Sequence, residues 1–181
     1  MEPEPAKCHR VSLAYLELSQ PPDDVIALYG NTIVELDLSH NKISDLRFLQ
    51  NLPRLQSLVV DHNHISSHVK IPLCPYLDTL WVNHNDIQNL GLFITTVAKS
   101  CPNLRILSMM NNQAAPSFFN GGTYQQYLDY RYFVISSLPK LEVLDYTNVQ
   151  PEERSEAKRI YPVSIVQPKK STRRKRHSRS S

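Results

Sequence analysis

The sequence predicts an α/β solenoid, in which short parallel strands form one concave sheet and turns with short helices cover its other side. Three observations predict this fold: a leucine pattern recurs with a fixed period, an asparagine follows most of the predicted strands, and a proline precedes them. The chain has 181 residues, of which 41% are hydrophobic. This length and composition are typical of one globular domain with a sizeable core.

The recurring pattern is L-x-x-L-x-L-x-x-N-x-I, which defines leucine-rich repeats. The better copies contain Ile33, Leu36, Leu38, Asn41 and Ile43; Leu55, Leu58, Val60, Asn63 and Ile65; Leu77, Leu80, Val82, Asn85 and Ile87; and Leu104, Leu107, Met109 and Asn112. Degenerate copies flank them, with Leu13, Leu16 and Leu18 before and Leu141, Leu144, Tyr146 and Val149 after. No single copy can bury its apolar face, so the copies are expected to stack.

Each position of the motif has a physical reason. Side chains of a strand alternate between its two faces, so the fourth and sixth positions point into the core and the third, fifth and seventh point outward. The asparagine at the ninth position turns the chain and pairs with backbone groups that the bend leaves open. A Leu/Cys-Pro-x-Leu tetrad precedes four of the strands, and its proline ends the preceding helix or turn.

Helical spacing of apolar residues predicts two helices after the third and fourth copies. One runs from Leu90 to Ser100 on the convex side, and the other from about Thr123 to Ser137, after a loop that starts at Ala114. We expect a flexible N-terminus over 1–12, a repeat domain with a C-terminal cap over 13–161, and a disordered basic tail over 162–181.

The C-terminal part of the domain resembles the LRRcap motif in Tyr130-Arg131, Val134-Ile135, Leu138-Pro139, Leu141, Leu144-Asp145, Glu153-Arg154 and Ala157. This motif closes the repeats of the spliceosomal A-prime subunit, acidic nuclear phosphoproteins, mRNA-export receptors and an axonemal dynein light chain. The resemblance covers residues 13–161 and implies a binding module without enzymatic activity. The segment 12–161, with Asn31-Thr32-Ile33-Val34-Glu35-Leu36-Asp37-Leu38-Ser39 and Leu104-Arg105-Ile106-Leu107-Ser108-Met109-Met110-Asn111-Asn112, is also similar to a member of this group concerned with melanocyte differentiation. That similarity implies a cytosolic role in pigment-cell differentiation through melanosome formation.

Several function classes are disfavoured by composition. The three cysteines do not suggest a disulfide framework, and no apolar run is long enough to cross a bilayer. We find no phosphate-binding glycine loop, no zinc-ligand spacing and no nucleophile with a partner base. We therefore expect a cytoplasmic monomer with no enzymatic activity, no cofactor, no metal and no small-molecule substrate.

Alternation places the only tryptophan, Trp81, at a fifth position on the concave face. Tryptophan is enriched among residues that dominate binding energy, so we expect a protein partner to bind there. The expected site comprises Trp81, Val59, Ile106, Met110, Asp37, Glu35, His62 and His84. The alternative is that the tail or the Phe118-Phe119 loop covers the indole. Acidic residues in the N-terminal half of this face make nucleic acid an unfavourable partner and a basic protein patch a favourable one.

The eighth positions contain His40, His62 and His84 in three successive copies. Equivalent side chains of parallel strands lie about 4.8 Å apart, so two imidazoles of such a column could share a metal. The ligands would be collinear instead of convergent, however, and no Cys or acid completes a shell. A polar surface that responds to pH is the preferred interpretation.

The basic tail explains the net charge of +3, because without its cations the chain is acidic. Its cluster comprises Lys169, Lys170, Arg173, Arg174, Lys175 and Arg176. Such a cluster is compatible with nuclear import, an anionic membrane or weak RNA binding, or with a solvated end. Two hypotheses remain: an adaptor that binds a protein on its concave face, for example a trafficking regulator such as a small GTPase, and a nuclear ribonucleoprotein component resembling the A-prime subunit.

Overall fold

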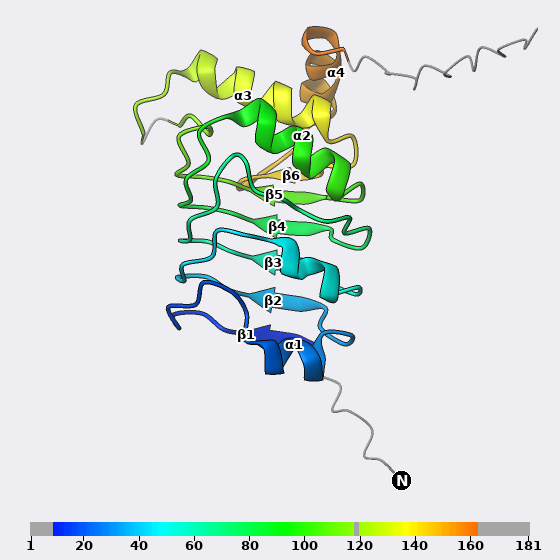
Figure 1. Ribbon diagram of the computed structural model, residues 1–181. Coiled ribbons are helices and arrows are strands. Elements are labelled where there is room, and N and C mark those ends of the chain that lie inside the picture. Colours follow the sequence, from blue (N-terminus) through cyan, green and yellow to red (C-terminus); the bar gives the residue numbers. More distant parts are fainter. Residues whose placement is uncertain (1–8, 118–119, 163–181) are drawn as a thin grey trace, which may run out of the picture.

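The computed structural model describes residues 9–117 and 120–162 and shows one sheet whose strands follow chain order (Figure 1). The strands are β1 (Arg10–Ser12), β2 (Glu35–Asp37), β3 (Ser57–Val59), β4 (Thr79–Trp81), β5 (Ile106–Ser108), β6 (Val143–Leu144) and β7 (Thr147–Asn148). The helices are α1 (Asp23–Tyr29), the 3-10 helix η1 (Arg47–Asn51), α2 (Leu90–Ser100), α3 (Tyr124–Ser137) and α4 (Pro151–Ile160). The predicted leucine-rich-repeat solenoid is confirmed.

The central strands pair in parallel and in the register that the motif predicts. Leu36 of β2 is the partner of Leu58, Leu58 of Leu80, and Leu80 of Leu107. Each of these fourth-position leucines is at most 2% exposed. Burying a leucine stabilises a fold by about 1.5–3 kcal/mol, so every added copy lengthens one continuous core.

The asparagines bind backbone groups across neighbouring repeats, as their position in the motif predicts. Asn63 accepts a hydrogen bond from the Ile43 N–H at 2.8 Å and donates to the carbonyl oxygens of Leu38 and Val60 at 2.9 and 3.1 Å. Asn85 repeats the pattern one copy later. Each turn is thus tied to the repeat before it.

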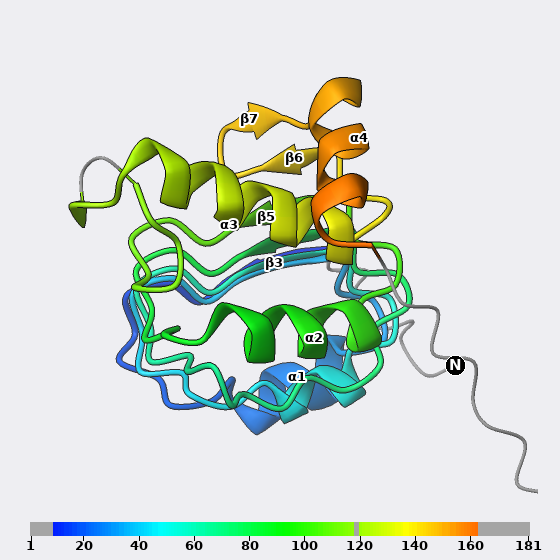
Figure 2. The ribbon, with the colours of Figure 1, turned by 90° about the horizontal axis from the view of Figure 1, so that it is seen from above.

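Figure 2 shows α1 and α2 on the same side of the sheet, which is the convex side. The opposite side carries the third, fifth and seventh positions of each copy, and we refer to it as the concave face. The helix predicted over Leu90–Ser100 is confirmed as α2, whose N-cap Asn89 accepts a hydrogen bond from the Leu92 N–H. The second predicted helix is α3. It begins with a capping box that Thr123 and Gln126 form. Within the described ranges, none of the helices combines the length and apolarity that a membrane span needs.

The predicted register of the first copy is wrong. β1 pairs Arg10 with Glu35 and Val11 with Leu36, so the fourth position belongs to Val11 and not to Leu16. Leu16 is 54% exposed. The sheet therefore begins at Arg10, ahead of residue 13, where we expected the repeat domain to start. Leu13 takes the sixth position of this register and packs against the core, whereas Leu16 lies in the turn that follows.

The last copy also differs from the expectation, because its strand folds back. Asp145 has a φ of 59°, and β7 then runs antiparallel to β6. Tyr146, which we expected at a core position, is 83% exposed. This hairpin covers the edge of the sheet, which α3 and α4 close at the C-terminal end (Figure 1).

The cap is held by a buried ion pair between α3 and α4. Arg131 is 2% exposed and donates to both carboxylate oxygens of Glu153, at 2.6 and 3.0 Å. A third hydrogen bond reaches the Leu144 carbonyl oxygen at 3.3 Å. These residues belong to the motif that resembles LRRcap, and their contacts give it a structural role.

Candidate protein-binding surface

The concave face presents two regular columns of side chains. The third positions pair Glu35 with Ser57, Ser57 with Thr79, and Thr79 with Ile106. The fifth positions pair Asp37 with Val59, Val59 with Trp81, and Trp81 with Ser108. In the first copy, Arg10 and Ser12 occupy these columns, whereas a register with Leu16 at the fourth position would have placed Tyr15 and Glu17 there.

Trp81 lies on this face and is 42% exposed in the described part of the chain. Its neighbours within the sheet are Val59 and Ser108. Ile106 is two residues from Ser108 and therefore lies diagonally to the indole, not directly beside it. Val59, Ile106 and Met110 are half-buried. The alternative cover at Phe118-Phe119 and the basic cluster from Lys169 to Arg176 fall outside the described residues.

A hydrogen-bonded track fixes the seventh positions beside the indole. The Asp61 carboxylate accepts from the backbone N–H of Asn83 at 2.8 Å and from its side-chain amide at 3.0 Å. The Asn83 Oδ1 in turn accepts from the Ser108 hydroxyl at 2.7 Å and from the Met110 N–H at 2.8 Å. Asn83 and Ser108 are buried. These hydrogen bonds therefore join three consecutive repeats through buried side chains.

Asn83 and Ser108 belong to this track but not to the site that the sequence predicts. The seventh position has no fixed residue type in the motif, so only the cross-strand register relates these two residues. Once that register is known, polar side chains at the seventh position of one copy and the fifth of the next indicate such a track.

The histidines of the eighth position form a stack along the rim where the strands end. The ring centroids of His40 and His62 are 4.1 Å apart, and those of His62 and His84 are 4.0 Å apart, with nearly parallel planes. Tyr15, which is the eighth position in the observed register of the first copy, extends the stack on the His40 side at 4.1 Å. Asn111 contacts the Nε2 of His84 at 2.9 Å on the other side.

All three histidines have a left-handed backbone, with φ between 52° and 55°. Non-glycine residues adopt this conformation infrequently, and histidine, asparagine and aspartate tolerate it best. The backbone N–H groups of His40, His62 and His84 donate to carbonyl oxygens of the next repeat at 2.9 Å. The turn is therefore repeated identically in each copy, and this repetition brings the rings into contact.

Stacking affects both the protonation of the imidazoles and their ability to bind a metal ion. Burial and the neighbouring His84 and His40 lower the pKa of His62 from its ordinary value, although Asp61 opposes the shift. The lone pairs of parallel rings point in parallel directions and do not converge on one ion. Among the residues described by the structure, no group of three or more His, Cys, Asp or Glu side chains has a geometry suited to a metal ion.

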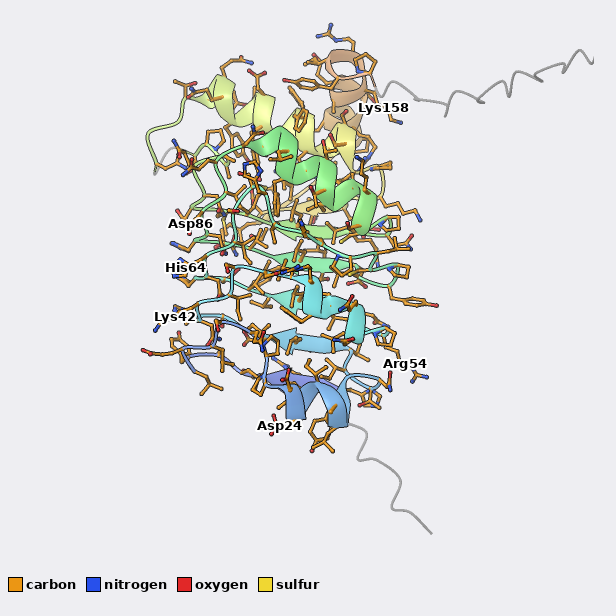
Figure 3. The ribbon with its side chains drawn as sticks, in the orientation of Figure 1. Asp24, Lys42, Arg54, His64, Asp86 and Lys158 are labelled. Atoms are coloured by element: carbon orange, nitrogen blue, oxygen red, sulfur yellow. The ribbon has the colours of Figure 1, made fainter. Side chains whose placement is uncertain are left out.

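Outside the histidine stack, a second column follows the same rim. This column consists of Lys42, His64 and Asp86, in that order (Figure 3). The His64 Nδ1 lies 3.3 Å from an Asp86 carboxylate oxygen, and the Lys42 ammonium lies 3.1 Å from Glu17. Glu17 is thus paired at the rim and not on the concave face.

The thiols of Cys74 and Cys101 are buried in the tetrads, where the equivalent residues are Leu52 and Leu138. The Cys74 hydrogen bond and burial raise the pKa of the Cys101 thiol. Because the Cys101 thiol stays protonated and buried, it is a poor nucleophile, which agrees with a packing role for Cys101.

Comparison with known proteins agrees with this architecture. A family model described as leucine-rich repeat matches residues 30–170. The leucine-rich melanocyte differentiation-associated protein of Homo sapiens is 34% identical over 144 residues, which are 78% of this chain and 62% of that relative. A chain of the Drosophila melanogaster SNF/U2A′ complex has a TM-score of 0.65 at 20% identity, covering 86% of this chain and 82% of that one.

At 20% identity, the Drosophila likeness shows the fold alone. The family match and the human relative carry more, because both span the stacked repeats. The chain therefore belongs to the leucine-rich repeat family, as a homologue of the human leucine-rich melanocyte differentiation-associated protein.

Proposed function

We propose that this chain is a non-enzymatic adaptor that binds a protein partner on its concave face, around Trp81. Leucine-rich-repeat proteins are generally interaction modules, which is the starting point of the proposal. The observation that carries it is the exposure of Trp81, at 42%. It lies on a face whose polar side chains form hydrogen bonds between repeats. A rigid, exposed aromatic side chain flanked by half-buried apolar ones is the composition of a binding hot spot.

The proposal extends to a cellular role. The name of the human relative associates that protein with melanocyte differentiation. We propose that this chain acts in the same process, in the cytoplasm. A trafficking regulator such as a small GTPase remains one candidate class of partner. The acidic concave face disfavours nucleic acid, and no observation on the described residues favours a ribonucleoprotein role over the adaptor role.

The test compares partners captured by proximity labelling in pigment cells with the wild-type chain, Trp81→Ala and Tyr76→Ala. Tyr76 is a matched control, because it is also an exposed aromatic residue, at 63%, but lies in a turn before β4. We expect Trp81→Ala to lose a set of partners that Tyr76→Ala keeps. An identical partner set for all three proteins would refute the concave site.

A further inference from the structure

The concave face carries acidic side chains on the β2 and β3 repeats and no basic side chain over β2 to β5. Its third, fifth and seventh positions there are Glu35, Asp37, Ser39, Ser57, Val59, Asp61, Thr79, Trp81, Asn83, Ile106, Ser108 and Met110. None of these positions holds a lysine or arginine. Glu35 has a cation 3.6 Å away at Arg10, on the edge strand, whereas Asp37 and Asp61 form no salt bridge with any described residue.

The Asp61 carboxylate lies on the same face as the indole, one side-chain position further along the strands. It accepts hydrogen bonds from both the backbone N–H and the side-chain amide of Asn83, which is two residues after Trp81. Side chains two apart on a strand share a face and lie about 7 Å apart. A fixed negative charge and an exposed aromatic ring are therefore adjacent, with Val59 on one side of the ring and the small Ser108 on the other.

We propose that the partner segment bound on this face is basic and apolar, and that it places an arginine against Trp81 with its guanidinium paired to Asp61. This inference rests on the proposed function and specifies its partner. A guanidinium is planar, so it stacks on an aromatic ring while its N–H groups donate in the plane to a carboxylate. Apolar side chains of the same segment contact Val59, Ile106 and Met110, and Asp37 and Glu35 attract further cations.

The chain's own basic tail is a less suitable occupant. Tyr161, near the end of the described residues, packs edge-on against Phe133 of α3 with ring centroids 5.5 Å apart. It lines one hollow together with Leu90 and Gly91 of α2. Since α2 covers the convex side (Figure 2), the described chain ends away from the indole. We therefore assign the face to a segment of another protein, and occupancy by the basic end of the chain is one outcome of the test below.

The single tryptophan makes the test direct, because its emission reports on this site in the full chain. The probe is a synthetic amphipathic peptide of leucine and arginine, and the comparison peptide has citrulline in place of each arginine. Citrulline keeps the shape of the side chain but has no charge. We expect the arginine peptide to shift the emission saturably, with an affinity that falls as NaCl rises, and the citrulline peptide to bind at least about tenfold more weakly.

Two variants locate the charge. Asp61→Asn is expected to weaken binding of the arginine peptide about tenfold, and Asp37→Asn to weaken it less. Asp24→Asn removes one charge from exposed α1 and should leave the affinity unchanged. Asp37→Asn does not touch Asn83, so it keeps the test valid if Asp61→Asn fails to fold. Equal binding of the two peptides, or equal loss with Asp24→Asn, would overturn the proposal.

Two further outcomes separate this inference from the proposed function. If Trp81→Ala loses cellular partners but Asp61→Asn keeps them all, the adaptor site stands and the basic partner class is wrong. If salt shifts the emission of the chain without any peptide, the basic end of the chain occupies the face, and the assignment to another protein is wrong.

Discussion

The asparagine ladder predicts that equivalent positions of the repeat differ in their contribution to stability. Asn63 and Asn112 occupy the same motif position and are 5% and 1% exposed. Replacing either by alanine removes the partner of one buried backbone N–H, that of Ile43 or that of Ile87. The two positions differ in the carbonyl oxygens that the side-chain amide serves.

In the middle of the ladder, the carbonyls are shared. The Leu38 oxygen accepts from both Asn41 and Asn63, and the Val60 oxygen accepts from both Asn63 and Asn85. Asn63→Ala therefore leaves each carbonyl with one donor. A buried group without a partner costs about 1–3 kcal/mol, so the single orphaned N–H predicts a loss of about 2 kcal/mol.

At the C-terminal end of the ladder, this sharing stops. The oxygens of Val82 and Met109 accept only from Asn112 among the described residues. Asn112→Ala leaves both carbonyls and the Ile87 N–H without partners, which predicts a loss of about 4–6 kcal/mol. The assay is urea denaturation of both variants, followed by circular dichroism. An equal loss, or a larger loss for Asn63→Ala, would refute the shared-carbonyl reasoning.

Three further perturbations test the cap, the rim and the N-terminal repeat. Glu153→Ala leaves the buried guanidinium of Arg131 without its carboxylate and should lower the free energy of unfolding by about 3–5 kcal/mol in the same assay. The lowered pKa of His62 means that the folded state binds its proton less readily than the unfolded state, so stability should fall as pH drops below about 6.5. Denaturation at pH 7.5 and pH 5.5 should show a smaller fall for His62→Asn, which keeps a residue that tolerates positive φ; an identical fall would contradict the pKa assignment. Gly30→Ala places a Cβ 2.7 Å from the Asn51 carbonyl oxygen and should destabilise the chain by about 1–3 kcal/mol, whereas an unchanged denaturation midpoint would show that the backbone yields there.

The central repeats could be predicted because several independent signals coincide there. The leucine spacing, the asparagine and the proline tetrad all give the same register, and the pairing of Leu36 with Leu58 and Leu80 agrees with it. The exposure of Trp81 follows from this register alone. The helix α2 could also be predicted from the sequence, because its apolar residues have helical spacing and an asparagine precedes it.

The first and last repeats could not be predicted in the same way, because their signals conflict. Val11 has no asparagine at the expected distance, and Leu16 stands at that position with its backbone in a turn. Leucine spacing alone then selects the wrong set of residues. At the other end, Asp145 reverses the chain after Leu144, and its carboxylate accepts from the Met109 N–H and the Tyr130 hydroxyl. These contacts come from separate parts of the sequence, so no local pattern contains them.

The stacked histidines and the polar track have a joint consequence for binding. The turns of the repeats use a left-handed residue such as His62, and the seventh positions Asp61 and Asn83 form hydrogen bonds with the next repeat. The rim and the floor of the concave face are therefore ordered before a partner arrives. Ordering side chains on association opposes binding, so a surface already fixed by folding loses less entropy when it docks. Trp81 stands on this fixed floor, so for the proposed partner we expect the affinity to depend more on the chemistry of the docked side chain than on the area covered.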